Sequence, residues 1–304
     1  MNDRYCGVLC VDKPQGFTSF DVVAKVRGIA RTRRIGHAGT LDPMATGVLP
    51  LFLGRATKAV DLLPQQGKRY TAVIQLGLET DTWDVTGREL CRRPVEVSPE
   101  QLHRALDRYR GEFSQLPPMY SAVQVGGKRL YELARKGLEV ERPARPVTIS
   151  RLELLSYDPQ TKEGSLRVGC SKGTYIRVLI EDLARAAGSC GTMTALRRTS
   201  ACGFSQEDAH SLEALKALAA EGRLEEALLP VEGLFALYPA VRVSPAQATR
   251  FQNGGGLDLA RLRGVPEGGL CRVKSPQGLF LGLGQVDRAR GEMKFVKSFL
   301  EGED

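Results

Sequence analysis

Apolar and polar positions along the chain follow two periodicities, one typical of strands and one typical of helices. Over residues 68–78, apolar positions alternate with polar ones, which predicts a strand that begins near Tyr70. After Thr18, apolar residues recur on one side of a helical period until about Ile29. Thr18 and Asp21 have the spacing of a capping box, so we expect a helix to begin there.

The same patterns predict further strands over residues 7–12, 147–157 and 164–170. A second helix is expected after Ser98, where Pro99 occupies the first helical position. A third is expected over residues 175–187. Strands come in hairpin-like pairs with helices between them, without a steady βαβ succession. We therefore expect an α+β fold built on a mixed, largely antiparallel sheet.

Two changes in composition divide the chain of 304 residues into parts. Residues 117–146 carry six basic and three acidic side chains and form a candidate mobile arm inserted in the first part. From residue 239 onwards, short strand-like pieces are separated by glycines, a pattern typical of a small β-rich domain. We therefore expect one domain over residues 1–238 and a second over residues 239–304.

The charge of the chain favours a polyanionic partner. It has 43 Lys and Arg against 35 Asp and Glu, a net charge of +8, although a merely soluble basic surface explains this number equally well.

The seven cysteines are scattered without a C-x-x-C pair, and the three histidines lie apart from them. We expect neither disulfides nor a metal site. No signal peptide or membrane-spanning run is visible, so we expect no membrane partner and a cytoplasmic protein.

The segment GHAGTLDPMATGVL, over residues 36–49, holds the most informative chemistry. Asp42 precedes Pro43, which biases the Asp42 backbone away from the helical region. Gly36, Gly39 and Gly47 permit conformations that other residues resist, so the loop can hold one carboxylate rigidly. An Asp before Pro in a glycine-rich loop is nevertheless most often a turn residue. Spacing alone does not make Asp42 catalytic.

This segment resembles the signature loop of the TruB-type tRNA pseudouridine synthases. Further motifs resemble that family in the same order over residues 7 to about 204: DKPQG at 12–16, KRY at 68–70, TDT at 80–82 with Asp84, PPMYSA at 117–122, SKGTYIR at 171–177 and LRR at 196–198. Residues 241–300 resemble, more weakly, the PUA-like RNA-binding domain that follows in the family. The basic arm over residues 117–146 resembles the thumb of the stand-alone bacterial members.

The resemblance implies an isomerase that converts uridine 55 in the T loop of tRNA to pseudouridine. Dyskerin-like relatives that use guide RNAs share the aspartate loop, but the thumb-like arm favours an enzyme without a guide RNA. The reaction involves no net redox change, so no cofactor is expected. We expect a monomer whose partner is the T stem-loop of tRNA.

The resemblance also implies roles for individual residues. Asp42 is the catalytic carboxylate, and because a closed site disfavours an ionised carboxylate, it needs a fixed cation, for which Arg177 is the candidate. Tyr70 stacks on the flipped uridine, and its hydroxyl is a candidate for the C5 proton transfer. His37 fills the vacated space in the RNA loop. The remaining assignments are substrate contacts by Tyr175 and Leu196, supporting roles for Lys13 and Asp84, and RNA-backbone contacts by Lys128, Arg129, Arg135 and Lys136.

Two other functions fit parts of the pattern. A non-enzymatic RNA-binding protein or tRNA chaperone needs the basic arm but not an Asp42–Arg177 pair. A glycosidase-like hydrolase normally uses two carboxylates, and Asp42 has no obvious acidic partner for that role. Taken without the resemblance, Tyr70, Tyr175 and Leu196 would pass as core residues, and Asp84 as an exposed loop acid.

Overall fold

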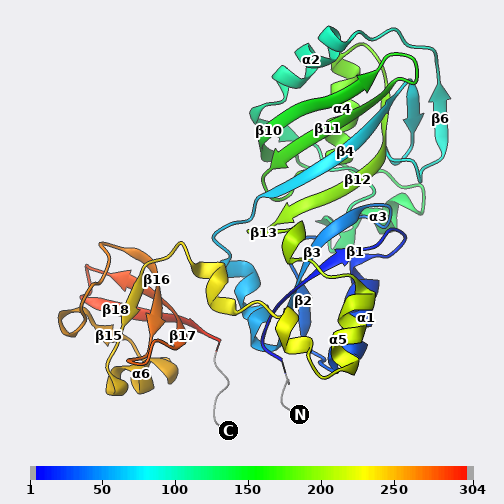
Figure 1. The fold of residues 1–304 in the computed structure, drawn as a ribbon. Coiled ribbons are helices and arrows are strands. Elements are labelled where there is room, and N and C mark those ends of the chain that lie inside the picture. The colour runs from blue at the N-terminus through cyan, green and yellow to red at the C-terminus, as the bar shows by residue number, and fades with distance from the viewer. Residues whose placement is uncertain (1–4, 300–304) are drawn as a thin grey trace.

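The computed structural model describes residues 5–299. A nine-stranded sheet is the framework of its larger unit (Figure 1). Its strands are β1 Gly7–Lys13, β2 Ile35–His37, β3 Thr46–Leu53, β4 Lys68–Leu76, β7 Gly111–Gln115, β10 Arg145–Asp158, β11 Glu163–Cys170, β12 Gly191–Ala201 and β13 Phe204–Ser205. They follow the order β1-β3-β12-β4-β11-β10-β7, with β2 beside β3 and β13 beside β12. Only the β3–β12 pair is parallel within the described sheet. The predicted mixed, largely antiparallel α+β fold is confirmed.

The sheet is narrow where β3 meets β12. The two strands share only two residue pairs, Arg197 with Thr46 and Arg198 with Gly47. Gly47 has φ +104°, and a Cβ there would lie 2.2 Å from the Arg198 carbonyl oxygen, so the close approach requires glycine. The loop over residues 38–45 enters β3 at this junction and carries Asp42 to it.

Helices cover the two halves of the sheet separately. They are α1 Ser19–Ala30, α2 Pro99–Arg108, α3 Leu130–Ala134, α4 Ile176–Ala186 and α5 Leu212–Ala220, with 3-10 turns at Gly54–Leu62, Gln206–Asp208, Leu224–Ala227 and Val231–Phe235. Apolar side chains of α1 and α5 pack on β1 and β3, whereas those of α2 and α4 pack on β4, β10 and β11. Burial of these apolar faces is the main stabilising contribution, and it gives each half of the sheet its own core.

The helix starts predicted from capping residues are confirmed. The Thr18 hydroxyl accepts from the Asp21 backbone N–H at 3.0 Å, and the Asp21 carboxylate accepts from the Thr18 N–H at 2.8 Å. Ser98 and Gln101 form the same reciprocal pair before α2. An N-cap of this kind contributes roughly 1 kcal/mol, and the first one fixes the start of α1 beside the Asp42 loop.

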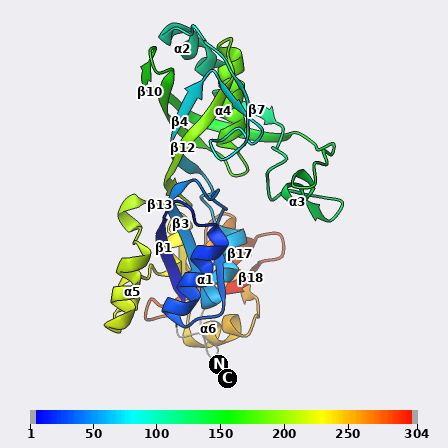
Figure 2. The same ribbon diagram turned by 90° about the vertical axis from the view of Figure 1, so that its right-hand side faces the viewer.

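The basic arm over residues 117–146 leaves the sheet after β7 and returns into β10. It contains a hairpin of two short strands, β8 Gln124–Val125 and β9 Lys128–Arg129, and α3 follows directly. Figure 2 shows α3 standing out to one side of the sheet. At the base of the arm, Arg142 Nε donates to the Pro117 carbonyl at 2.6 Å, which ties the two chain segments together.

A second, small β-rich unit follows. Its sheet has the order β14-β16-β17-β18-β15, with β14 Ala240–Arg242, β15 Leu257–Asp258, β16 Gly269–Lys274, β17 Phe280–Asp287 and β18 Glu292–Ser298. Helix α6 Pro245–Gln252 and a 3-10 turn at Leu259–Arg261 complete it. The rings of Phe235, Phe280 and Phe299 lie 5.5–6.2 Å apart between centroids and share one apolar cluster with Val8 and Phe52 of the large sheet. This shared cluster fixes the small unit against the large one.

Several strands and helices were not predicted from the sequence, among them β2, β7 and β12. All residues of β3 except Thr46 are buried, so the strand shows no alternation of apolar and polar positions. The short hairpin of β5 Leu78–Thr80 and β6 Glu89–Arg92 is mostly polar. Helix α6 spans only eight residues, too few for a clear helical period.

Among residues 5–299, no helix is long and apolar enough to cross a membrane.

Candidate active site

Asp42 and Arg177 meet although 135 residues separate them in the chain. Arg177 Nε lies 3.0 Å from Asp42 Oδ2, and its Nη2 lies 3.4 Å from Asp42 Oδ1, so the guanidinium faces both carboxylate oxygens. The Arg177 side chain is 5% exposed, whereas that of Asp42 is 37% exposed. The cation is therefore part of the protein interior, and the carboxylate it holds faces outward.

All three guanidinium nitrogens of Arg177 make further contacts that fix the side chain. It donates to the carbonyl oxygens of Thr82 at 3.0 Å and Tyr120 at 2.9 Å, and its Nε lies 3.5 Å from Asp84 Oδ2. Asp84 is buried, not the exposed loop acid that the sequence alone allowed. Its Oδ1 accepts from the Thr86 N–H at 2.9 Å and from the Thr86 hydroxyl at 2.5 Å. Asp84 thus balances the buried cation and orients it toward Asp42.

The turn before α4 is held by Gln115, which the sequence did not single out. The Gln115 amide accepts from the Tyr175 N–H at 2.8 Å and donates to the Tyr175 carbonyl at 3.2 Å. Gln115 is 3% exposed and lies at the end of β7. This two-point contact fixes Tyr175, the residue before α4, and with it the first turn that carries Arg177. A glutamine in an edge strand gives no such signal in one sequence.

Ser19 and Arg198, to which no role was assigned from the sequence, fix the Asp42 loop. The Ser19 hydroxyl accepts from the Leu41 N–H at 2.9 Å, next to Asp42 in the chain. Arg198 is fully buried and donates to carbonyl oxygens on both sides of the loop, at Val48 (2.7 Å) and Gly39 (3.1 Å). Because buried carbonyl groups need partners, Arg198 stabilises this one loop conformation.

Lys13 supports the same loop from the end of β1. Its Nζ donates to the carbonyl oxygens of Phe17 at 2.6 Å, Pro14 at 2.9 Å and Pro43 at 3.3 Å, and the side chain is fully buried. Burial lowers the pKa of Lys13 to about 8, although the nearby charge of Asp42 opposes that effect. Lys13 thus bridges the chain before α1 to the residue that follows Asp42.

We expect Lys13→Met to lower the free energy of unfolding by about 1.5–3 kcal/mol, because carbonyl groups in the loop lose a charged donor. Urea denaturation checks this value. Lys25→Met, on the exposed side of α1, is the control and should change stability by less than about 0.5 kcal/mol. Equal stability of the two variants would mean that Lys13 does not hold the loop.

The site opens into two connected cavities. The inner one, of about 220 Å³, is lined by both members of the ion pair and by Tyr70, Tyr175 and Leu196. The outer one, of about 640 Å³, lies between the start of α1, residues 81–88 and the basic arm. Asp42 and Arg177 line both cavities, so the ion pair lies where the cavities join.

Tyr70 is 5% exposed, and burial raises its pKa to about 12. Its hydroxyl is therefore protonated at neutral pH. Lys68, two residues earlier, also lines the inner cavity, and burial lowers its pKa. The sequence motif included Lys68, but no role was assigned to it. An aromatic ring and a lysine thus line the cavity beside Asp42.

His37 lies at the end of β2 and is partly buried. Burial, followed by the charges of Arg198 and Lys68, lowers the pKa of His37 below its usual range. Its Nδ1 is buried and has no hydrogen-bond partner among the described residues. The ring packs edge-on against Phe20, with 5.6 Å between centroids and 82° between planes. His37 is not among the described residues that line the two cavities at Asp42, but its neutral ring contacts Phe20, which lines the outer one.

The four basic residues predicted to contact RNA fall into two pairs. Arg129 and Arg135 line the outer cavity, and their guanidinium carbons lie 5.9 and 5.5 Å from the centroid of the Tyr131 ring. Lys128 and Lys136 are exposed on the arm and are not among the described residues that line this cavity. The structure thus brings one pair to the site and leaves the other on the outer surface.

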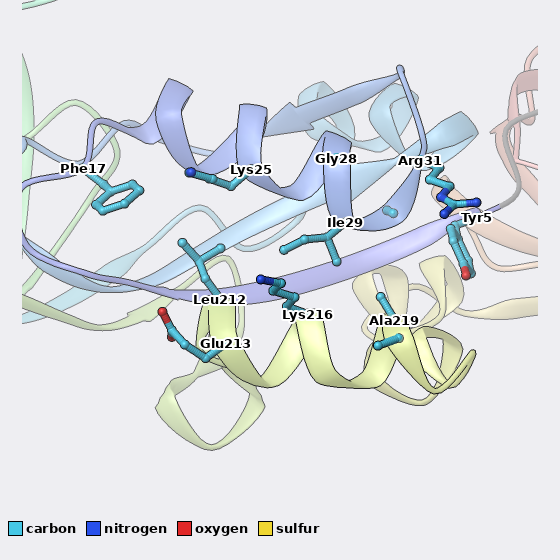
Figure 3. A pocket seen from close by; sticks show the side chains of 12 residues that line it. Tyr5, Phe17, Lys25, Gly28, Ile29, Arg31, Leu212, Glu213, Lys216 and Ala219 are labelled. Carbon is cyan, nitrogen blue, oxygen red and sulfur yellow. The ribbon is translucent and has the colours of Figure 1, made fainter.

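A larger cavity, of about 750 Å³, lies between α1 and α5 (Figure 3). Lys25 and Lys216 line it together with Phe17, Ile29 and Leu212. Glu213 is the one carboxylate among its described lining residues, and the pair at Asp42 is not part of it. The cavities at Asp42 therefore remain the better candidate for chemistry.

Within residues 5–299, no group of three or more His, Cys, Asp or Glu could hold a metal ion.

Comparisons with known proteins show the family to which the chain belongs. Three family models match consecutive parts of the chain: TruB family pseudouridylate synthase (N terminal domain) over residues 27–176, tRNA pseudouridylate synthase B C-terminal domain over 177–236, and Pseudouridine synthase II TruB, C-terminal, over 239–290. The tRNA pseudouridine synthase B of Aromatoleum aromaticum is 45% identical over 283 residues, which cover 92% of this chain and 89% of that protein. The protein of the same name from Pseudomonas aeruginosa is 42% identical, with 92% and 91% covered.

Solved structures show the same fold. The chain superimposes on "Crystal Structure of a Cbf5-Nop10-Gar1 Complex" with a TM-score of 0.74 and 26% identity, over 97% of this chain and 85% of that one. The family models, the relatives and the shared fold thus define a pseudouridylate synthase, an isomerase. At 42–45% identity over 92% of its length, the chain belongs to the TruB pseudouridylate synthase family.

Proposed function

We propose that this protein isomerises uridine 55 in the T loop of tRNA to pseudouridine, without a guide RNA, and that Asp42 carries the chemistry. The names of the relatives, tRNA pseudouridine synthase B, support tRNA as the substrate. The observation that carries the proposal is the Asp42–Arg177 pair, in which a buried cation presents one outward-facing carboxylate to a cavity lined by Tyr70. We propose a monomer that acts in the cytoplasm.

The reaction needs few groups. The C1′–N1 bond breaks, the free base turns, C1′ joins C5, C5 loses its proton and N1 gains one. Asp42 starts this sequence by attack on C1′, by addition to C6 or by removal of a sugar proton, and each route requires an ionised carboxylate near the ribose. The Arg177 guanidinium, 3.0 Å from Asp42 Oδ2, offers that charge a fixed counterion.

The burial of Asp84 supports isomerisation over hydrolysis. A glycosidase-like mechanism needs a second carboxyl group that reaches the glycosidic bond. Asp84 is 4% exposed, and its oxygens are occupied by Thr82, Thr86 and Arg177. Asp81 lines the outer cavity but not the inner one, and its Oδ1 accepts from the Arg88 N–H at 2.9 Å, so Asp42 is the carboxylate that lines both cavities. Binding without catalysis is also disfavoured, because an RNA-binding surface gains nothing from a carboxylate held in its cleft.

Tyr70 and His37 supply aromatic surface for a base taken out of the RNA loop. An enzyme that acts on a base in folded RNA must extrude that nucleotide and hold it by stacking. Tyr70 lines the inner cavity, where the flipped uridine would lie, with Tyr175 and Leu196 as further contacts. Its protonated hydroxyl is a poor proton acceptor, which favours stacking as the main role. The neutral His37 ring, beside the outer cavity, suits the vacated position in the loop.

The basic arm supports direct tRNA recognition. Some structural relatives are named as parts of complexes, Cbf5-Nop10-Gar1 and Nop10-Cbf5 of a box H/ACA sRNP. This chain carries its own arm, which brings Arg129 and Arg135 to the cavity that contains Asp42. We propose that the arm closes over the T stem-loop and contacts its phosphates.

The proposed function is tested by incubating purified protein with a tRNA transcript and no other RNA. Carbodiimide labelling followed by primer extension maps pseudouridine, and mass spectrometry follows any loss of base. We expect one pseudouridine, at position 55, with unchanged RNA mass. Release of free uracil would instead indicate a hydrolase, and tight binding with an unmodified transcript would indicate a binding protein.

Salt dependence tests the role of the arm. Each phosphate contact on single-stranded segments contributes roughly 0.7 to the log–log slope of affinity against salt. Neutralising Lys128, Arg129, Arg135 and Lys136 together should flatten that slope. Neutralising Arg104 and Arg108 on α2, away from the outer cavity, is the control and should leave it unchanged. An unchanged slope in the arm variant would mean that the arm does not touch the RNA backbone.

A further inference from the structure

Phe20 has an unusual position for a phenylalanine. It is 61% exposed, and among residues 5–299 it is the only Phe, Tyr or Trp classed as exposed. The other large hydrophobic side chains that are exposed are aliphatic: Val85, Leu90, Leu116, Leu138, Leu155, Leu237 and Leu279. Single exposed aliphatic residues are ordinary on protein surfaces. An exposed phenyl ring at the edge of a candidate active site is not explained by packing.

The structure holds Phe20 in a fixed place relative to Asp42. Phe20 lies in the first turn of α1, directly after Ser19, whose hydroxyl bonds the Leu41 backbone. The capping box at Thr18 fixes the start of that turn. The Phe20 backbone and the catalytic loop are thus joined through one buried hydroxyl, so the ring is presented by a rigid element.

One side of the Phe20 ring is occupied and the rest is open. His37 packs perpendicular to it at 5.6 Å between centroids, so the imidazole covers at most one face of the phenyl ring. Phe20 is 61% exposed and lines the outer cavity together with Arg129 and Arg135 of the arm. The cavity therefore offers guanidinium groups and an open aromatic face within one space.

This combination matches the chemistry of a single-stranded RNA segment. Successive bases stack on aromatic side chains while the phosphates meet arginine and lysine. Free aliphatic groups, peptides or small anions would not need both an open ring and several guanidinium groups. An RNA strand that inserts one uridine into the inner cavity must also place its neighbouring nucleotides near the mouth of that cavity, where Phe20 lies.

We propose that Phe20 is a base-stacking residue: its open face takes a nucleobase that flanks the target uridine, while its contact with His37 keeps the imidazole ring in position. This inference rests on the proposed function, since it assumes RNA in the cleft. Phe20 acts in substrate binding and in positioning, and it takes no part in proton transfer.

The test measures equilibrium binding of the full protein to a T stem-loop RNA, with Phe20→Leu and Phe20→Trp compared against wild type. Phe20→Leu should weaken binding about 5- to 150-fold, the range expected for loss of one base–aromatic stack. Phe20→Trp keeps an aromatic face and should bind within a few-fold of wild type. Leu237→Ala removes a side chain that is 68% exposed and does not line the described cavities at Asp42, so it is the matched control and should bind as wild type does.

A spectroscopic readout separates stacking from a merely structural effect. With 2-aminopurine placed beside the target uridine, wild type and Phe20→Trp should quench its fluorescence on binding, and Phe20→Leu should quench it less. Thermal unfolding of each variant checks that the fold is intact. Wild-type affinity and quenching in Phe20→Leu would overturn the inference.

The outcomes also separate this inference from the proposed function. Pseudouridine formation by the wild type, with Phe20→Leu indistinguishable from it in binding and quenching, would overturn the role of Phe20 alone. Binding that depends on an aromatic ring at position 20, without any pseudouridine in wild-type reactions, would overturn the proposed function and leave the stacking role standing. Absence of stem-loop binding by the wild type would overturn both.

Discussion

Asp42→Asn is expected to lower the single-turnover rate of pseudouridine formation by about 10²–10⁴-fold or more, the range contributed by a positioned acid or base. The amide has nearly the same shape as the carboxylate, so Arg177 keeps its bonds to the Thr82 and Tyr120 carbonyls and its ion pair with Asp84. Affinity for tRNA should stay within a few-fold of wild type, because a carboxylate contributes little attraction to a polyanion.

Asp12→Asn is the matched control for this result. Asp12 also forms an ion pair with an arginine, Arg197, at 2.9–3.0 Å, and it is 36% exposed against 37% for Asp42. Loss of an arginine-paired carboxylate at that position should affect stability more than chemistry. Turnover by Asp42→Asn close to that of Asp12→Asn would remove Asp42 from the role of nucleophile or base.

The second large effect is expected at Tyr70. Tyr70→Phe keeps the ring and removes the hydroxyl, whereas Tyr70→Leu removes the aromatic surface, whose stacking is worth about 1–3 kcal/mol per base. Because burial raises the pKa of Tyr70 to about 12, the hydroxyl stays protonated over the working pH range. We therefore expect Tyr70→Phe to be slow but active and Tyr70→Leu to be inactive in single-turnover reactions.

Tyr109→Leu controls for damage to the shared core. Tyr109 packs against the same apolar cluster as Tyr70 but does not line either cavity at Asp42. It should lose stability and keep its rate. Equal inactivity of Tyr70→Phe and Tyr70→Leu, with tRNA binding retained, would assign the C5 proton transfer to the hydroxyl. Near wild-type rates in Tyr70→Leu would mean that another aromatic residue holds the base.

The sequence predicted the parts of the fold in which local signals are strong. The two predicted capping boxes, at Thr18 and Ser98, and the alternating strand that holds Tyr70 are present where the residue patterns placed them. Strand β3 was not predicted because it is buried on both faces, so its apolar and polar positions do not alternate. Helix α6 was not predicted although Ser244, Pro245 and Gln247 repeat the start signal of α2, because its eight residues give too few turns for a helical period.

The candidate site depended on the family resemblance, because its contacts are long-range. Arg177 and Asp42 are 135 residues apart, and no local pattern connects them. The resemblance named the motif residues, but it did not show that Asp84 is buried or that Gln115 fixes the turn before α4. Nor did it assign Arg198 to the carbonyl groups around the Asp42 loop. Such positioning contacts follow from tertiary packing and carry no pattern in a single sequence.

The measurement that most directly tests isomerisation of uridine 55 follows the hydrogen on C5. A tRNA transcript made with uridine tritiated at C5 should release one equivalent of tritium per tRNA when the wild-type protein acts on it, since the C5–H bond breaks as C1′ joins C5. The same transcript with cytidine at position 55 should release none, and no free uracil should form in either case. Sustained release from the cytidine-55 transcript would contradict the assigned position, and absence of release from the unaltered tRNA would contradict the reaction itself.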